Sequence, residues 1–404
     1  MTGPTPGRPL AGLRVVAVEQ YGAAPFGTLH LALLGAEVIK IENPREGGDV
    51  SRTVGPHFIE GIDKSAASVL FQALNVNKRS VTLDLGQADG RAVLGKLVAT
   101  ADALIHNLRG DVPARLGLTR DALAPSNPKL VVCHLTGYGR DAPRADWPGY
   151  DFLMQAEAGF FALTGAPDGE PARFGLPMVD YATGLTAALA LVSAVMAART
   201  TGTGSEIDVS LFDTALVHLS YIGHWRLTHG HNQGRERRSA HAALVPCQLY
   251  RTGDGWIYLM CNKEKFWRTL CEAIGRPEWI EDARFRRFPD RMTHRDLIET
   301  LLDEALSART TTEWMTAFAG KVPAAPVHDI AQALDNPFVT GSDRLQDVAI
   351  PGGSFRAIAG ATRIDGRRAH LTAAPTIGAD TDAVLGEIGY DADAVAELRR
   401  RSVV

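Results

Sequence analysis

Short runs of β-branched and apolar residues alternate with longer helical patterns along the first half of the chain. Between the first two runs, AAPFGTLHLALLGAE has the leucine spacing of a helix packed on a sheet, and Gly35 is placed to end it. This alternation predicts βαβ units and a parallel sheet, hence an α/β fold. The candidate strands are Leu13–Val18, Glu37–Ile41, Ser80–Leu83, Ala103–His106 and Leu130–Leu135.

A long Ala-rich helical run, YATGLTAALALVSAVMAART, follows Asp180 and ends at the breaker Gly202–Gly204. Its longest charge-free stretch, Tyr181–Ala198, is only about as long as the shortest membrane span and is diluted by Gly, Thr and Ser. We therefore expect a buried helix. A strand-like pattern resumes at Glu206–Val209.

The pattern changes from about Gly223. The polar, basic and His-rich stretch HWRLTHGHNQGRERRSAHAA has little periodicity, so we expect a linker or an active-site loop there. Two β-rich runs around Gly253–Gly255 then predict a hairpin, and three amphipathic patterns predict helices, so this middle segment reads as a separate α+β domain. The C-terminal part returns to mixed patterning at Ala324–Val327 and Arg356–Ile364, and the run Thr381–Ile388 predicts a helix.

Composition narrows the class of protein. A chain of 404 residues with 45% hydrophobic and 22% charged residues predicts a globular protein with more than one core. Its net charge of −4 provides no general field for nucleic acid or an anionic membrane, so we expect neither partner. The start MTGPTPGRPLAGLRVVAVEQ has no signal-peptide pattern, and the four cysteines show no C-x-x-C spacing, so we expect a cytoplasmic protein with reduced thiols.

Several common catalytic motifs are absent. The sequence contains no G-x-G-x-x-G after the first strand, no G-x-x-x-x-G-K-[ST], no H-E-x-x-H and no G-x-S-x-G. His224, His229 and His231 lie close together in the sequence, but no carboxylate or cysteine completes a ligand set at a usual spacing. We expect no metal.

Asp180 is the first candidate for chemistry, because it stands directly before the long Ala-rich helix. The simplest interpretation is an N-cap, since Asp is among the preferred capping residues. The same position would keep a carboxylate ionised, with an ordinary pKa of roughly 3.9, and able to act as a nucleophile without a separate base. Both roles are compatible.

Polar and basic residues flank two of the predicted strands. They are explained either by solvated loops or by a phosphorylated ligand at the carboxyl ends of the strands, where open α/β sheets bind ligands. The residues are Asn75, Asn77, Lys78 and Arg79 before one strand, Asn107, Arg109 and Arg115 after another, and Lys40 and Arg52 nearby.

Seven blocks in this order resemble the class III CoA-transferase family (CaiB/BaiF type), which includes formyl-CoA transferase and α-methylacyl-CoA racemase relatives. The similarity spans nearly the whole chain. The blocks are PLAGLRVVAVEQYGAAPFGTLHLALLGAEVIKIENPREGGDVSR, NVNKRSVTLDL, ADALIHNLRGDVPARLGL, NPKLVVCHLTGYGRDAP, PGYDFLMQAEAGFFALTG, VDYATGLTAALALVSAVMAARTTGTGSEIDVSLFD and DGWIYLMCNKEKFWRTLCEAIGRPEW.

The resemblance implies acyl transfer between CoA and carboxylic acids by covalent catalysis. The family nucleophile is an aspartate whose matching position is Asp180. This residue would form a mixed anhydride with the acyl group and then an aspartyl-CoA thioester, and an incoming carboxylate would complete the exchange. Acyl-CoA is then a substrate, and no tightly bound cofactor is expected.

The resemblance also implies a set of CoA-binding positions. Asn43 stands where the family often has a basic residue, so a phosphate contact could come from Lys40 or Arg52 instead. The matching positions are Tyr21, Gly22, Ala23, Lys78, Arg79, Asn107, Leu108, Arg115, Leu116, Tyr138 and Gly139.

The racemase branch is the alternative function. Racemases pair the aspartate with a histidine, but Tyr150 stands at that position here, and a phenol with a pKa near 10 is a poor proton shuttle. The glycine-rich loop of the formate and oxalate branch is replaced by the basic stretch Arg235–Pro246. Within that stretch, Arg238 and His241 are candidates to hold the distal carboxylate of a succinyl-, mesaconyl- or malyl-type acid, and a solvated linker is the competing interpretation.

The fold implied by the resemblance is an interlocked homodimer. Each chain would have a Rossmann-like large domain built from both chain ends, residues 1–222 and 326–404, and a smaller α+β middle domain, residues 223–325. A non-catalytic CoA-binding relative is a third possibility, distinguished by CoA binding without turnover.

Overall fold

The computed structural model describes residues 8–141 and 143–404. Residues 1–7, part of the start examined for a signal peptide, and Ala142 lie outside this description. The chain divides into two compact units. Unit 1 runs up to Ala158 and includes Gly175–Ser220 and Pro337–Val404; unit 2 comprises Gly159–Phe174 and Tyr221–Asn336. The predicted middle domain, residues 223–325, has other boundaries than unit 2 and lacks residues 159–174. The domain assignment stays a prediction.

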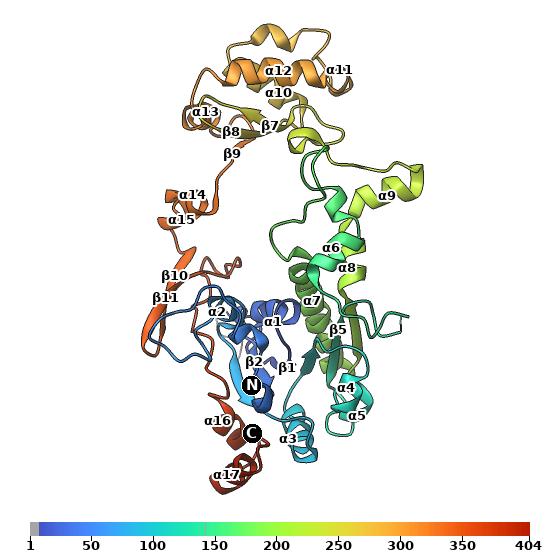
Figure 1. The fold of residues 1–404 in the computed structure, drawn as a ribbon, viewed down its shortest axis with the longest axis vertical. Helices are drawn as coiled ribbons and strands as arrows, with labels where there is room; N and C mark the ends of the chain where they lie inside the picture. Colours follow the sequence, from blue (N-terminus) through green and yellow to red (C-terminus); the bar gives the residue numbers. More distant parts are fainter. Residues whose placement is uncertain (1–7, 142) are drawn as a thin grey trace. The chain divides into compact units, whose positions relative to one another are not determined.

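Unit 1 is built on a six-stranded parallel sheet in the order β3-β2-β1-β4-β5-β6 (Figure 1). This is the order of a doubly wound dinucleotide-binding fold, and it confirms the predicted parallel α/β sheet. The strands are β1 (Arg14–Val18), β2 (Glu37–Glu42), β3 (Arg79–Thr82), β4 (Ala103–His106), β5 (Val131–Thr136) and β6 (Glu206–Ser210).

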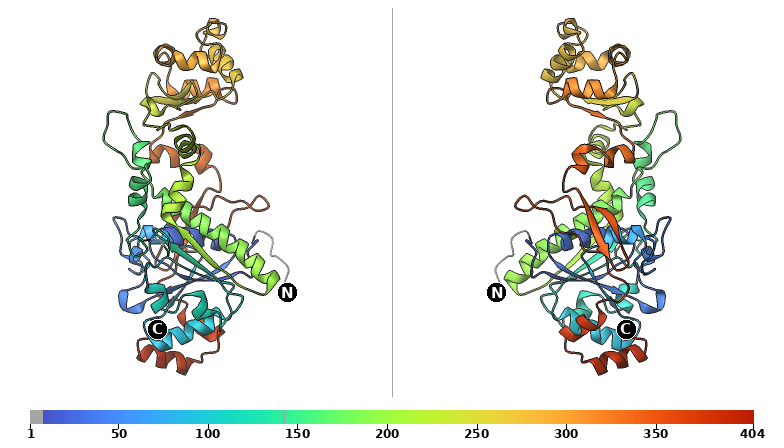
Figure 2. Two further views of the ribbon diagram at one scale, coloured as in Figure 1. Left: turned by 90° about the vertical axis from the view of Figure 1, so that its right-hand side faces the viewer. Right: turned by 90° about the vertical axis from the view of Figure 1, so that its left-hand side faces the viewer.

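Helices cover both faces of this sheet (Figure 2). On one face α3 packs with the C-terminal helices α16 and α17 into a single apolar core, so the two ends of the chain share a core. The helices of unit 1 are α1 (Ala23–Leu33), α2 (Val69–Asn75), α3 (Ala88–Val98), α4 (Val112–Arg115), α5 (Arg120–Leu123), α6 (Asp151–Glu157), α7 (Met178–Thr201), α8 (Leu211–His218), α15 (Pro337–Thr340), α16 (Thr381–Glu387) and α17 (Ala392–Arg400).

An antiparallel hairpin, β10 (Leu345–Ile350) with β11 (Gly353–Ile358), packs through Val348 near Leu29 of α1. The range Arg356–Ile364, where the sequence shows mixed patterning, contains only the end of β11, which stops at Ile358 opposite Leu345, the first residue of β10.

Unit 2 has its own sheet and its own apolar core. The predicted hairpin is confirmed, because β7 (Cys247–Arg251) and β8 (Trp256–Met260) pair antiparallel around residues 252–255, and β9 (Ala324–Pro326) adds to β8. The helices are α9 (Ser220–His229), α10 (Glu264–Ala273), α11 (Phe288–Thr293), α12 (Arg295–Leu306), α13 (Thr311–Phe318) and α14 (Ile330–Leu334).

The expected loop from Gly223 is wrong at its start, since α9 is helical through His229. Its sequence lacks apolar periodicity because none of its residues is buried, so the pattern that usually reveals a helix is missing. Beyond it, residues 230–236 form no helix or strand, as the pattern predicts.

Helix α7 is the longest helix and the one with a membrane-like composition. It is the single helix among the described residues long and apolar enough to span a membrane, with a mean hydropathy of 1.7 over its most apolar window. Within unit 1, however, it packs on α1 and β5 and buries residues such as Val179, Ala187 and Leu191. The expected stop at Gly202 is confirmed, where φ of 77° closes the helix.

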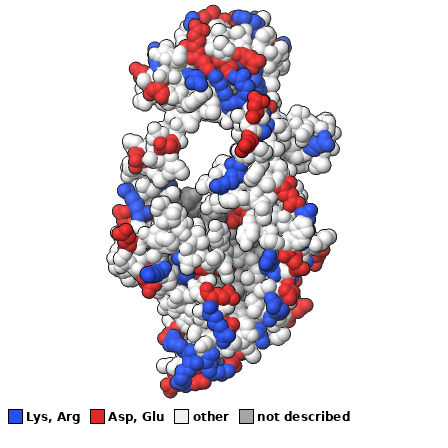
Figure 3. All heavy atoms as spheres, viewed as in Figure 1, with Lys and Arg blue, Asp and Glu red and all other residues white. Residues whose placement is uncertain are grey.

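Charged side chains are interspersed over the surface. On the face drawn in Figure 3, groups of Lys and Arg and groups of Asp and Glu both occur among mainly uncharged residues, so neither sign covers the face.

Helices α1 and α7 touch through two glycines. A Cβ atom at Gly184 would lie 2.2 Å from the carbonyl oxygen of Ala23, and one at Gly27 would lie 2.3 Å from the carbonyl oxygen of Gly184. The two backbones therefore approach closely, and this contact fixes the second turn of α7 against the start of α1.

Replacing Gly184 with alanine is expected to destabilise the protein. The added methyl group meets backbone atoms, which cannot rotate away, so we expect a loss of about 1–3 kcal/mol in the free energy of unfolding. Gly386→Ala is the matched control, because this glycine of α16 has nothing within 4 Å of a built Cβ and should gain about 0.5–1 kcal/mol. Denaturant unfolding measures both. Equal stability of the two variants would contradict the close contact.

Candidate active site at the start of α7

Asp180 is the third residue of α7, and its carboxylate is buried with 8% exposure. The N-cap position belongs to Pro177, so the capping role expected for Asp180 is wrong. Instead, the backbone N–H of Asp180 donates to Oδ2 of Asp151 at 2.9 Å. Asp151 thus replaces a conventional cap and holds the first turn of α7.

The carboxylate of Asp180 lies against the turn that opens α1. A Cβ atom at Gly22, the N-cap of α1, would fall 2.2 Å from Oδ2 of Asp180, so only glycine leaves room for this carboxylate. Among the described residues, no side chain caps the first turn of α1. The N-terminus of α1, which carries the positive end of the helix dipole, therefore lies beside the carboxylate of Asp180.

A second carboxylate changes the ionisation of Asp180. Asp151 is itself buried at the start of α6, and its Oδ1 accepts a hydrogen bond from Nε2 of Gln155 at 2.6 Å. Burial, and then the like charge of Asp151, raise the pKa of Asp180 to about 7. The ordinary pKa expected for Asp180 is therefore wrong, because the sequence alone shows neither the burial of this side chain nor its proximity to Asp151.

Two side chains hold the loop between β1 and α1 through its backbone. Nζ of Lys40 donates to the carbonyl oxygen of Glu19 at 2.9 Å. Asn107 accepts from the N–H of Gln20 at 3.0 Å and donates to its carbonyl oxygen at 2.7 Å. The sequence-predicted residues Tyr21, Gly22 and Ala23 follow directly, and they share the region of Asp180 with Asn107.

Lys78 does not meet the expectation of a phosphate contact. Its amino group is fully buried and donates to Oε1 of Glu19 at 2.8 Å, to the carbonyl oxygen of Pro25 at 2.9 Å and to Oδ1 of Asn75 at 3.0 Å. Burial lowers the pKa of Lys78 to about 8, although Glu19 opposes this change. With its three donors engaged inside the protein, Lys78 supports the β1–α1 loop and not a ligand.

Arg79 begins β3, and its guanidinium pairs with Glu37 and Glu387. Glu37 begins β2, so these pairs lie at the amino ends of the strands, whereas Asp180 lies beyond the carboxyl end of β1. The expectation that Arg79 joins the carboxyl edge is therefore wrong.

The residues after β4 are held by a buried chain of imidazoles. Nδ1 of His106 accepts from the N–H of Leu108 at 3.3 Å, Nε2 of His106 lies 2.7 Å from Nδ1 of His134, and Nε2 of His134 lies 2.7 Å from Oε1 of Glu206. Burial lowers the pKa of His106 to about 3, so it stays neutral and can accept from Leu108. Leu116 packs at the edge of the adjoining apolar core. Arg115 is exposed and pairs with Asp111 at 3.1 Å.

Tyr138 and Gly139 form the turn after β5. The hydroxyl of Tyr138 donates to Oε2 of Glu157 at 2.8 Å, and Gly139, with φ of 93°, donates its N–H to Oγ1 of Thr136. Tyr150, the residue before Asp151, is 63% exposed. It stands next to a carboxylate that contacts α7.

Arg238 and His241 belong to unit 2. The guanidinium of Arg238 pairs with Asp303 at 2.7 Å and Glu299 at 3.3 Å, so its expected availability for a substrate carboxylate is not met in this arrangement. His241 lines a pocket of about 340 Å³ together with Tyr221, Trp225 and Tyr258.

The sequence reasoning assigned no role to Asp151 or Asp49. Asp151 lies within the PGYD stretch, but a lone Asp before a helix does not reveal a partner 29 residues away. Among residues 8–141 and 143–404, no group of three His, Cys, Asp or Glu side chains is placed to hold a metal ion.

Comparison with known proteins identifies the family. Residues 10–381 match the model of CoA-transferase family III. The chain is 33% identical to a succinate–glutarate CoA-transferase of Agrobacterium fabrum, covering 86% of each chain. It is 35% identical to an acetyl-CoA:oxalate CoA-transferase of Acetobacter aceti, covering 85% of this chain and 88% of the relative. A crystal structure of a CAIB/BAIF family protein from Brucella suis matches with a TM-score of 0.81 and 31% identity, over 95% of this chain and 100% of that one.

The raised pKa of Asp180 predicts a pH-dependent stability. Between its ordinary value of 3.8 and about 7, the folded carboxyl keeps a proton that the unfolded one has lost. The free energy of unfolding should therefore fall as pH rises through this range, by up to about 4 kcal/mol, and level off above it. Asp180→Asn removes this dependence and should exceed wild type in stability at pH 8.

The matched control is Asp213→Asn, since Asp213 is also the third residue of a helix, α8, but is exposed. Denaturant unfolding at several pH values compares the three proteins. An identical pH dependence in wild type and Asp180→Asn would contradict the raised pKa.

Proposed function

This chain belongs to CoA-transferase family III and is a CoA-transferase, and on this premise we propose that Asp180 is its nucleophile and short-chain dicarboxylic acids are its substrates. The observation that carries the first part is the buried carboxylate of Asp180, which lies against Gly22 at the uncapped start of α1. A carboxylate with a pKa near 7 is partly ionised at neutral pH and more basic than an ordinary aspartate, which favours nucleophilic attack.

The proposed reaction has four steps. The carboxylate of Asp180 attacks the thioester carbonyl of the donor acyl-CoA, and the C–S bond breaks to give a mixed anhydride and CoA thiolate. The thiolate attacks the aspartyl carbonyl, which releases the donor acid and leaves an aspartyl-CoA thioester. The acceptor carboxylate then attacks this thioester to form a second anhydride and thiolate. Attack of the thiolate on the acceptor carbonyl gives the new acyl-CoA and restores Asp180.

Each tetrahedral intermediate carries an oxyanion. The first-turn N–H groups of α1 are the proposed donors, because they adjoin the carboxylate and no side chain caps them among the described residues. Both the anhydride and the thioester are hydrolysed by water. The burial of Asp180 limits this loss.

CoA is proposed to lie along the carboxyl ends of β1, β4 and β5. Tyr21, Gly22 and Ala23 would meet the pantetheine end, and Tyr138 and Gly139 the turn beside it. Lys78 and Arg79 are engaged inside unit 1, so exposed Arg115, with Arg109 nearby, is the proposed phosphate contact.

The proposed acids are short-chain dicarboxylates of the succinyl, mesaconyl or malyl type. The named relatives act on succinate, glutarate and oxalate, each with two carboxylates. His241 stays a proposed contact for the distal carboxylate, because it lines a pocket in unit 2. A cytoplasmic location without nucleic acid or membrane partners stays a prediction.

We also propose a homodimer. Helix α7 exposes an apolar stripe on unit 1, in which Leu185, Leu189 and Met196 are 45%, 71% and 67% exposed. Residues spaced by four and seven positions lie on one face of a helix, so they form a single surface. A second copy of the chain would remove this surface from water.

Replacing the nucleophile should abolish transfer. We expect Asp180→Ala to lower the rate of succinyl-CoA:glutarate exchange by at least about 10³-fold, since the substitution removes the proposed nucleophile. Asp213→Asn, at the same position in α8, should keep wild-type activity. Mass spectrometry of wild type incubated with succinyl-CoA and hydroxylamine should locate the adduct on Asp180. Solvent deuterium at the α-carbon of a 2-methylacyl-CoA, without an acceptor acid, would instead favour the racemase.

The homodimer predicts a mass near twice 43.4 kDa in solution. Leu189→Glu places a charge in the proposed interface and should shift the protein towards the monomer at micromolar concentration. Light scattering after size-exclusion chromatography, over a series of loading concentrations, measures both proteins. A wild-type mass of 43.4 kDa at every concentration would rule out the dimer.

A further inference from the structure

The turn that meets Asp180 contains a non-glycine residue in the left-handed region. Tyr21 has φ of 65°, and the next residue is Gly22, whose backbone lies against the carboxylate of Asp180. Such a conformation costs of order 1–3 kcal/mol and persists only where the surroundings enforce it. Something near Tyr21 must therefore supply that constraint.

The constraint comes from Asp49. The N–H of Tyr21 donates to Oδ1 of Asp49 at 3.1 Å. Because Lys40 and Asn107 already hold the two preceding residues through their backbones, Asp49 fixes the last residue before Gly22. Each residue of the loop from Glu19 to Tyr21 is thus held by a different side chain.

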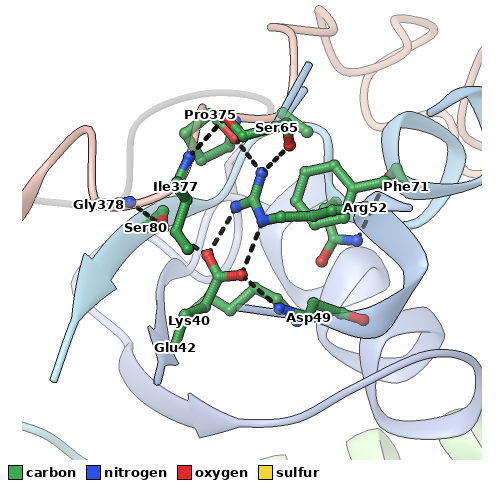
Figure 4. Close-up of polar contacts among 12 residues, drawn as sticks. Lys40, Glu42, Asp49, Arg52, Ser65, Phe71, Ser80, Pro375, Ile377 and Gly378 are labelled. Atoms are coloured by element: carbon green, nitrogen blue, oxygen red, sulfur yellow. Dashed lines mark hydrogen bonds and ion pairs between the residues drawn. The ribbon is translucent and has the colours of Figure 1, made fainter. Parts of the chain in front are cut away.

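The side chain of Asp49 is itself held in place by burial and by several polar contacts. It is 1% exposed, its Oδ1 also accepts from the N–H and Oγ of Ser51 at 2.8 Å each, and its Oδ2 pairs with Nζ of Lys40 at 2.8 Å. Figure 4 shows Lys40 and Asp49 beside the Glu42–Arg52 pair. Although burial opposes ionisation, Lys40 and the Ser51 bonds hold the pKa of Asp49 at about 2, so it is an anion at any working pH.

We propose that Asp49 is a positioning residue for the reaction at Asp180: by accepting the N–H of Tyr21 it keeps the turn left-handed and holds Gly22 and the start of α1 against the nucleophile. This inference rests on the proposed role of Asp180. Its role is alignment: Asp49 bonds to Tyr21, Ser51 and Lys40, and its effect reaches Asp180 through the turn at Gly22. Misplacement of the reacting groups by about 1 Å can cost about 10²-fold in rate.

Two substitutions at one position separate alignment from stability. Asp49→Ala removes both the acceptor for Tyr21 and the ion pair with Lys40. Asp49→Asn removes the ion pair but keeps an acceptor oxygen, which the three donors converging on Oδ1 should retain on their side. We expect both variants to lose similar stability, whereas kcat for succinyl-CoA with glutarate falls about 10- to 100-fold in Asp49→Ala and less than about threefold in Asp49→Asn. KM for succinyl-CoA should change less than about threefold in both.

Asp63→Ala is the matched control. Asp63 makes the same pair of hydrogen bonds with Ser65, at 2.7 Å each, but it is exposed and holds no residue of the β1–α1 loop. Its kcat should equal that of wild type. An unchanged kcat in Asp49→Ala would overturn the proposal. Equal losses of kcat in Asp49→Ala and Asp49→Asn would also overturn it, because the loss of activity would then parallel the loss of stability.

A second pair of variants tests the turn itself if Asp49→Ala does not fold. Tyr21→Pro removes the backbone N–H and forbids a positive φ. Tyr21→Gly keeps the N–H and permits a positive φ, and both variants lose the aromatic ring. We expect kcat to be at least about tenfold lower in Tyr21→Pro than in Tyr21→Gly, and equal values would overturn the proposal. If wild type does not exchange CoA between these acids, the proposed function fails. The crystal structure of Asp49→Ala then decides the inference, supporting it if Tyr21 leaves the left-handed region and overturning it if Tyr21 stays.

Discussion

The bidentate ion pair between Glu42 and Arg52 is the interaction on which unit 1 depends. Both side chains are about 1% exposed, and the guanidinium also stacks on Phe71 at 3.8 Å and donates to the carbonyl oxygens of Ser65 and Pro375 (Figure 4). Glu42 in turn accepts from the N–H of Asp49. Burying two charges is costly, and loss of one partner of such a pair costs about 3–5 kcal/mol. The pair therefore fixes the C-terminal segment, β2 and the Asp49 turn together, and through Asp49 it reaches Tyr21.

The sheet could be predicted from the sequence because its information is local. Strands β4 and β5 are short, mainly apolar runs in which every residue is buried, and β4 coincides with its predicted range Ala103–His106. The stop of α7 at Gly202 is equally local, since a glycine permits the left-handed cap. Helix α9 and strand β10 were missed for the complementary reason: α9 buries no residue and β10 (LQDVAI) alternates in burial only over its second half, so neither has a sustained apolar period.

The candidate site divides in the same way. The family blocks led to Asp180, and the structure brings Tyr21, Gly22, Ala23 and Asn107 to the same loop region. The environment of these residues could not be predicted, because it depends on pairs distant in sequence, such as Lys78 with Glu19 across 59 positions and Asp180 with Asp151 across 29. A basic residue in the sequence has the same appearance whether it meets solvent or a buried carboxylate, so Lys78 was assigned to a ligand.

Two buried carboxylates on either side of the Tyr21–Gly22 turn show how environment separates their roles. Asp49 faces a cation and three hydrogen-bond donors, which hold its pKa at about 2, whereas burial and the neighbouring anion Asp151 raise the pKa of Asp180 to about 7. The same side chain is thus a permanent anion in one place and a titrating group in the other. A permanent anion can hold a strained turn at every pH, while a group that ionises near neutrality retains the basicity that attack on a thioester requires. Because Asp49 holds Tyr21 and the next residue, Gly22, lies against Asp180, the fixed position of Asp49 also fixes the surroundings of Asp180.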